Sequence, residues 1–166
     1  CLNGESSGGY LAVGTAMELA KTGEAGRIKL LVPDVPAISA HWITPDDGSP
    51  THWSRNEVMK ASGDGGHLET VKMLCHDWKQ QFSDLDPYVF PGEMPDEVLK
   101  KLPACVILTN EHCFLRKDAE LFASRLLAHD KLLDYCVRPG ISHYSDIPGL
   151  YSDKSSIFSQ VLETYL

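Results

Sequence analysis

The chain has 166 residues, of which 43% are hydrophobic and 23% are charged, so it can form one domain with a buried core, and a second domain is not expected. Its formal net charge is −8, and no basic cluster offsets that charge, which argues against a surface for nucleic acid or anionic membranes. No segment approaches the ~18 consecutive apolar residues of a membrane span.

The cysteines do not form a disulfide framework. Their number is odd and no two of them have C-x-x-C spacing, which favours free thiols and a reducing, cytoplasmic location. They are Cys1, Cys75, Cys105, Cys113 and Cys136. The chain begins as if inside a strand, so we expect it to be a piece of a longer protein.

The first third of the chain predicts a strand, a helix and a second strand. Residues 1–3 are typical of the tail of a strand. Apolar residues at helical spacing predict a helix from Ser7 to Lys21, with Gly23 as its stop signal. The apolar run from Ile28 to Val32 ends at Pro33 and is typical of a buried strand in a parallel sheet.

Residues 33–100 interrupt this alternation with many prolines and glycines. A possible capping box at residues 54–57 predicts a short helix, and an apolar stripe over residues 68–82 predicts a longer one. Because loops on a rigid scaffold often carry selectivity, we expect residues 33–100 to form a rim that covers a substrate. A plain surface excursion with one core-packing helix is the alternative.

From residue 104 the alternation resumes. The pattern predicts a strand over residues 104–109, a helix over 117–128 and a strand over 132–138. A loop over residues 139–143 and an amphipathic helix ending near Tyr165 follow. Strands that alternate with helices predict an α/β fold with a mainly parallel sheet.

The first predicted strand runs into a G-x-S-x-G motif, from Gly4 to Gly8. Such a motif carries a nucleophilic serine on a sharp strand-to-helix turn, so Ser6 is the candidate nucleophile. The backbone N–H of Ser7 is then a candidate oxyanion donor. The alternative is a turn serine in a loop that holds a phosphate or another ligand.

A base and an acid are needed to activate such a serine, and they are expected after later strands. His143 follows the strand over residues 132–138, and imidazole can accept a proton near neutral pH. The alternative for His143 is a surface-loop histidine. Between Ser6 and His143 another strand ends at residues 109–113, where a carboxylate could hold the imidazole in its productive tautomer. The order serine, acid, histidine is that of α/β-hydrolases.

At these segments the chain resembles the hormone-sensitive-lipase-like esterases, the alpha/beta hydrolase fold-3 group, over their C-terminal half. The resemblance lies in residues 4–12, 88–91, 102–103, 109–116 and 139–143. It implies that residues 1–166 are the C-terminal part of a single α/β-hydrolase domain, truncated before the nucleophile strand. It also implies a serine esterase that cleaves small ester substrates, with Ser6 as nucleophile and His143 as base. No metal or other cofactor is implied, and a homodimer is left open.

The resemblance departs from the family at the acid. The family pattern N-E-x-D-P-L-R-D places Cys113 where aspartate stands and Phe114 where proline stands. A thiol does not supply a fixed negative charge. Glu111 lies two residues earlier on the same face of an extended segment, so it is the candidate replacement acid. Asp118 falls near a helix start, where a capping or dipole role is expected.

The H-G-G-G segment that carries the family's other oxyanion donors is absent, as are the strands on the far side of the nucleophile strand. The chain is therefore part of a full-length enzyme, which we expect, or a defective or partial gene product. The functional alternative is a catalytically impaired or non-catalytic small-molecule-binding protein, since some relatives are receptors. His112 and Cys113 are adjacent and face opposite sides of a strand, so no zinc site is expected.

Overall fold

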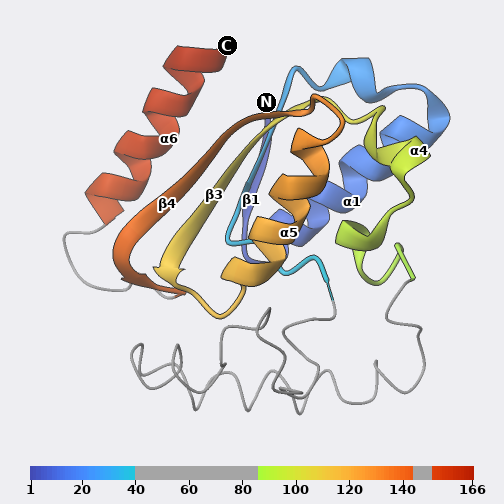
Figure 1. Ribbon diagram of the computed structural model, residues 1–166. Coiled ribbons are helices and arrows are strands. Elements are labelled where there is room, and N and C mark those ends of the chain that lie inside the picture. The colour runs from blue at the N-terminus through green and yellow to red at the C-terminus, as the bar shows by residue number, and fades with distance from the viewer. Residues whose placement is uncertain (40–85, 144–150) are drawn as a thin grey trace.

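The computed structural model describes residues 1–39, 86–143 and 151–166, which form one sheet with helices on both faces (Figure 1). The predicted helices within residues 54–82 lie outside the described residues, as does Cys75. The elements in chain order are β1 (Leu2–Glu5), α1 (Ser7–Thr22), the 3-10 turn η1 (Ala25–Arg27), β2 (Leu30–Asp34), the 3-10 turn η2 (Pro91–Glu93), α4 (Asp96–Leu99), β3 (Ala104–His112), α5 (Arg116–Leu127), β4 (Leu132–Ser142) and α6 (Tyr151–Tyr165).

The sheet has the order β1-β2-β3-β4, and each neighbouring pair is parallel. This confirms the predicted α/β fold with a mainly parallel sheet. In such a sheet the carboxyl ends of all strands lie at one edge, where ligands usually bind. The residues that follow β1, β3 and β4 are Ser6, Cys113 and His143, so the topology gathers these three side chains at that edge.

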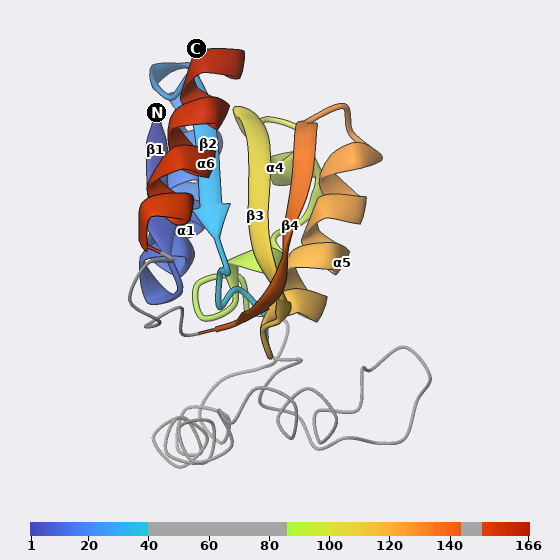
Figure 2. The same ribbon diagram turned by 90° about the vertical axis from the view of Figure 1, so that its left-hand side faces the viewer.

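Helices cover both faces of the sheet, with α1 and α5 on one face and α6 on the other, as Figure 2 shows from the side. Alternate residues of β3 serve the two faces. Cys105 and Ile107 belong to the core under α1 and α5, whereas Val106 and Leu108 belong to the core under α6. Because both faces are buried, the first part of the strand, residues 104–108, is an unbroken apolar run rather than an alternating one.

Helix α1 packs closely on the sheet through small residues. Its buried stripe contains Ala12, Ala16 and Ala20 as well as Val13 and Met17. The helix ends as the sequence predicts, at Gly23, whose φ of 81° is left-handed. The N–H groups of Gly23 and Glu24 donate to the carbonyls of Ala20 and Leu19, which satisfies the last turn.

All four strands end later than the sequence predicts, and β2 is the first example. β2 continues through Pro33 to Asp34, because Pro33 and Asp34 still pair with Gly4 and Glu5 of β1. Its register with β3 passes from Leu31 to Asp34, a gap that contains Pro33, which has no N–H to donate. The prediction that the strand ends before Pro33 is therefore wrong.

The predicted loop over residues 139–143 is also wrong. β4 continues through Pro139 and Gly140 to Ser142. Gly140 adopts a left-handed φ of 69°, and the pairing with β3 shifts there. A β-bulge therefore keeps the strand paired beyond the proline, and this is a tertiary effect that local turn signals do not reveal.

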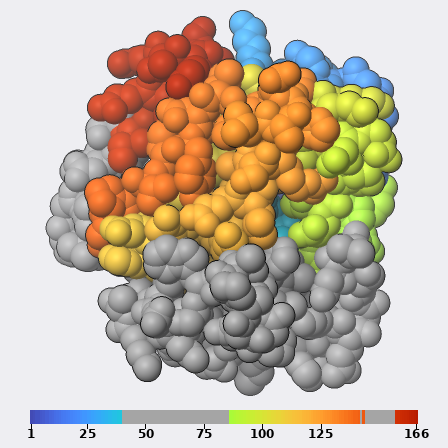
Figure 3. All heavy atoms as spheres, in the orientation of Figure 1, coloured from blue at the N-terminus to red at the C-terminus, as the bar shows by residue number. Residues whose placement is uncertain are grey.

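The face of the molecule seen in Figure 3 is formed by α5, with the η2–α4 segment on one side of that helix and β4 on the other. None of the helices in the described ranges is long and apolar enough to cross a membrane.

Candidate active site

The turn after β1 holds Ser6 in a strained conformation. Its φ of 57° and ψ of −116° lie outside the regions that non-glycine residues usually adopt. The N–H of Ser6 donates to the carbonyl of Asp34 at 2.9 Å, and its carbonyl accepts the N–H of Tyr10 at 3.0 Å and that of Ala37 at 3.4 Å. These contacts from β2, α1 and the following segment hold the turn in place.

Ser6 occupies the N-cap of α1, yet its side chain makes no capping hydrogen bond. A serine at this position normally accepts a backbone N–H of the first turn, which is worth about 1 kcal/mol. Here Oγ lies 2.9 Å from Nε2 of His143 instead. The N–H of Ser7, at the first position of the helix, has no acceptor one turn earlier and lies at the positive end of the helix dipole.

The turn is compact because α1 starts very close to β1. An added Cβ on Gly4 would lie 2.2 Å from the carbonyl oxygen of Gly8, and one on Gly9 would lie 3.0 Å from Cβ of Pro36. At Gly8, by contrast, the described part of the structure places nothing within 4 Å of an added Cβ. The two motif glycines therefore differ, since only Gly4 is required by close backbone approach.

His143 is buried, with 4% of its surface exposed. It follows β4, which lies three places from β1 in the sheet. The ring of Phe114 lies against the imidazole, with centroids 4.7 Å apart at a tilt of 48°. Phe114 therefore covers one side of the imidazole and restricts its rotation. In the sequence, Phe114 is visible only as a departure from the family pattern, and its contact with His143 depends on the fold.

The sulfur of Cys113 lies 3.1 Å from Nδ1 of His143, on the side of the ring opposite Ser6. The backbone N–H of Leu115 donates to the same sulfur at 3.3 Å. If the thiol donates to Nδ1, the proton on the ring lies on Nε2, and the imidazole cannot accept the proton of Ser6. If Nδ1–H donates to sulfur, Nε2 can accept it.

The side chain of Glu111, the candidate acid, is directed to a different partner. Its Oε2 accepts the backbone N–H of Gly140 at 2.7 Å and lies 3.9 Å from Nε2 of His112. The backbone carbonyl of Glu111 accepts Nη1 of Arg116 at 3.2 Å. The structure thus brings Ser6, His143 and Cys113 into one chain of contacts and places the Glu111 carboxylate on the bulge of β4.

Asp34, whose carbonyl accepts the Ser6 N–H, also forms an ion pair with the buried Arg138. Both terminal nitrogens of the Arg138 guanidinium contact the Asp34 carboxylate, with Nη1 at 2.8 Å from Oδ2, and Nε donates to Oδ1 of Asn110 at 2.6 Å. Arg138 is only 3% exposed. The network joins β2, β3 and β4, and the last two are the strands that Cys113 and His143 follow. Polar residues near the ends of apolar strands could draw attention to each residue singly, but no local pattern indicates that they pair.

We expect Arg138→Met to lower the free energy of unfolding by about 3 kcal/mol, because it leaves the half-buried Asp34 carboxylate beside an apolar side chain, without its cation. Denaturant unfolding measures this loss. The matched control is Arg27→Met, since the exposed Arg27–Glu24 pair should contribute less than about 1 kcal/mol. Equal losses in the two variants would contradict the assigned importance of the buried pair.

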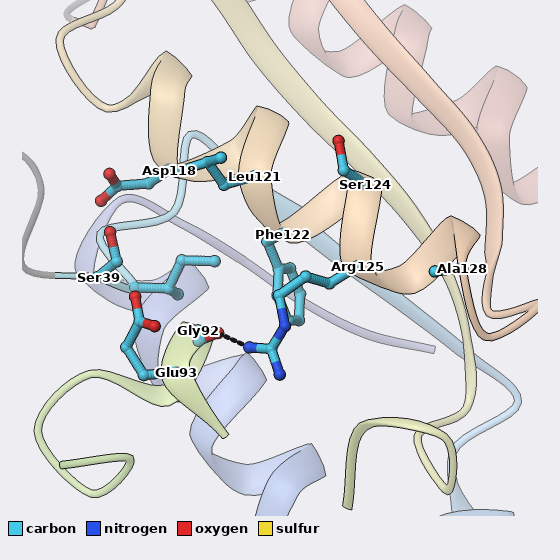
Figure 4. Close-up of a pocket in the computed structure, with 10 residues that line it drawn as sticks. Ser39, Gly92, Glu93, Asp118, Leu121, Phe122, Ser124, Arg125 and Ala128 are labelled. Atoms are coloured by element: carbon cyan, nitrogen blue, oxygen red, sulfur yellow. Dashed lines mark hydrogen bonds between the residues drawn. The ribbon is translucent and has the colours of Figure 1, made fainter. Parts of the chain in front are cut away.

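A separate cavity of about 400 Å³ lies between α5 and the η2 turn (Figure 4). The guanidinium of Arg125 spans its edge and donates to the carbonyls of Gly92 and Met94 at 2.5 Å each and to Asp96 at 2.6 Å. The hydrogen bond from Arg125 lowers the pKa of Asp96 below its usual range. Arg125 thus fastens the η2–α4 segment to α5. Asp118, for which a capping or dipole role is expected, is not the N-cap of α5, since Leu115 takes that position; it is buried in the first turn and lines this cavity.

The cysteines of the described ranges are free thiols. Burial raises the pKa of Cys105 to about 12 and that of Cys136 to about 11, so both are protonated at neutral pH. Neither thiol is therefore a nucleophile under ordinary conditions. Cys113 differs from them because it contacts an imidazole.

Comparisons with known proteins agree with the α/β fold described above. A family model described as "alpha/beta hydrolase fold" matches residues 1–145. A search of the curated proteins finds no significant match.

Several solved structures are similar to this chain over nearly its whole length. Brefeldin A esterase, a bacterial homologue of human hormone-sensitive lipase, superposes with a TM-score of 0.73 at 23% identity, over 98% of this chain and 45% of its own. Carboxyl esterase 2 of the fungus Tuber melanosporum gives 0.73 at 21% identity, over 99% and 53%. An esterase of the archaeon Pyrobaculum calidifontis gives 0.69 at 28%, over 98% and 49%. The chain spans about half the length of these structures.

Proposed function

We propose that this chain, which belongs to the alpha/beta hydrolase fold family, is part of a serine hydrolase of carboxylesterase type. The observation that carries the proposal is the 2.9 Å contact between Ser6 Oγ and His143 Nε2, on a strained strand-to-helix turn. A nucleophile and a base within hydrogen-bond distance are the geometric signature of covalent catalysis.

The proposed reaction has two halves. Nε2 of His143 takes the proton of Ser6 as Oγ attacks the ester carbonyl, and the N–H of Ser7 stabilises the developing oxyanion. His143 then gives the proton to the departing alcohol, which leaves an acyl group on Ser6. A water molecule, deprotonated by the same imidazole, releases the carboxylic acid and regenerates Ser6.

The group at Nδ1 determines how well His143 can act. Acceptance of a proton at Nε2 requires the other ring proton to lie on Nδ1, where Cys113 is the neighbour. An ordinary thiol is mostly protonated near neutral pH and carries no fixed charge. We therefore expect an esterase that is much slower than one with a carboxylate at this position.

Hydrolysis of p-nitrophenyl acetate and p-nitrophenyl butyrate by the purified protein tests the proposal. The parent is expected to release p-nitrophenol with saturation kinetics, and Ser6→Ala is expected to reduce kcat by about 10²-fold, since the triad already lacks its acid. Equal hydrolysis by the parent and Ser6→Ala would show that the esterase assignment is wrong.

The thiol at Nδ1 also supports a second candidate function, a protein that binds a small molecule at this site without efficient catalysis. The two candidates differ in covalent chemistry, because only an activated serine reacts quickly with a fluorophosphonate. A protein of the second kind would show a thermal shift with a small ester but would acquire no label on Ser6.

Three further expectations belong to this proposal. We propose that residues 33–100 form the rim over the substrate, a role supported by the way Arg125 fastens the η2–α4 segment to α5. The free thiols support a reducing, cytoplasmic location. A homodimer stays a prediction that sedimentation can test.

A further inference from the structure

The carboxyl end of β4 must turn toward β1 for His143 to contact Ser6. β4 is three places from β1 in the sheet, and neighbouring strands lie about 4.8 Å apart, so the two strands are separated by about 14 Å. Figures 1 and 2 show the last residues of β4 curving across the ends of the neighbouring strands. The 2.9 Å contact between Ser6 and His143 therefore depends on this bend.

The bend coincides with the β-bulge. Asn110 pairs with Arg138 and His112 pairs with Ser142, so β3 places one residue between these two pairs where β4 places three. The two extra residues of β4 disrupt the ladder and bend the strand, as bulges do near active sites. Gly140 lies in the middle of the three with φ of 69°, three residues before His143.

The carboxylate of Glu111 supplies a hydrogen bond at this bulge. Glu111 is the one residue of β3 between the Asn110–Arg138 and His112–Ser142 pairs, and its Oε2 accepts the N–H of Gly140 at 2.7 Å. Pro139, the residue before Gly140, has no N–H. The side chain of Glu111 thus bonds the middle of the bulge in a stretch where the regular ladder is interrupted.

We propose that Glu111 is a positioning residue, which holds the Gly140 bulge and thereby directs His143 toward Ser6. This inference rests on the proposed function for its consequence in the reaction. It differs from the idea that Glu111 is the acid of a triad, because an acid acts by its charge on His143. A positioning residue acts through the length of its side chain and its ability to accept the Gly140 N–H.

Two variants separate reach from charge. Glu111→Gln keeps the length and the acceptor oxygen but removes the charge, whereas Glu111→Asp keeps the charge and shortens the side chain by one methylene. The second-order rate of fluorophosphonate labelling of Ser6 is measured in the purified protein. Since a displacement of about 1 Å can cost about 10²-fold, we expect Glu111→Asp to slow labelling by roughly 10- to 100-fold. Glu111→Gln should stay within about threefold of the parent, because an amide oxygen can still accept the N–H.

The matched control is Glu18→Asp, because the exposed Glu18 pairs with Lys21 on the surface of α1. It should label at the parent rate. If Glu111→Gln is slowed and Glu111→Asp is not, the charge of Glu111 is what matters and the positioning role is wrong. Parent-like labelling by both Glu111 variants overturns it as well.

If the parent itself acquires no label, the proposed function fails, and NMR then decides the positioning role separately. Glu111→Asp should speed exchange of the Gly140 amide by about tenfold or more and shift the His143 ring signals, whereas Glu111→Gln should change neither. Unchanged signals in Glu111→Asp would overturn the inference.

Discussion

Replacement of Cys113 by aspartate is expected to raise kcat for ester hydrolysis by about 10²- to 10⁴-fold. The upper figure corresponds to the effect of removing the charge of the acid in a serine triad of another fold. An aspartate here would present two oxygens, one to Nδ1–H of His143 and one to the N–H of Leu115, which both contact the sulfur now. The charge would fix the proton on Nδ1 and stabilise the imidazolium that forms during attack.

The position can accept this charge because it lies just before α5, whose N-terminus favours negative groups. Cys113→Asn is the control, since asparagine has nearly the same size and no charge. The gain should appear in kcat and be absent in Cys113→Asn. Equal rates in the aspartate and asparagine variants would contradict the role assigned to this position.

Gly4→Ala is expected to reduce fluorophosphonate labelling by at least about 10²-fold, because the turn that carries Ser6 cannot keep its geometry. The added Cβ would meet the carbonyl oxygen and carbon of Gly8 at 2.2 and 2.3 Å, and both are backbone atoms that no side-chain rotation can move. The free energy of unfolding should fall by about 3 kcal/mol, at the upper end of overpacking costs.

Gly8→Ala is the matched control within the same motif. In the described part of the structure nothing lies within 4 Å of its added Cβ, and the residue is in the second position of α1. Alanine in a helix is favoured over glycine by up to about 1 kcal/mol. Labelling and denaturant unfolding should therefore separate the two variants. Similar losses in both would show that close approach at Gly4 is not the cause.

The fold could be predicted from the sequence to the extent that local patterns determine it. The apolar run of β3, the helical stripe of α1 and the stop at Gly23 each depend on residues close together in the chain. The positions at which β2 and β4 end depend instead on pairing with the neighbouring strands. Pro33 stays in β2 because β1 pairs with it, and Gly140 stays in β4 because the bulge accommodates it.

The candidate site divides in the same way. The motif around Ser6 and the family resemblance indicated Ser6 and His143 before any geometry was known, and their catalytic roles stay predictions. The Arg138–Asp34 pair joins residues 104 positions apart, so no local pattern indicates it. The partner of Glu111 depends on the two extra residues of β4, and these become visible only in the pairing register.

Fluorophosphonate labelling of the purified protein, with the modified residue identified by mass spectrometry, tests the central claim most directly. We expect one adduct on the peptide that contains Ser6, its absence in Ser6→Ala, and its retention in Ser159→Ala, which changes an exposed serine of α6. An adduct on another residue, or one that persists in Ser6→Ala, would contradict the assignment of Ser6 as the nucleophile.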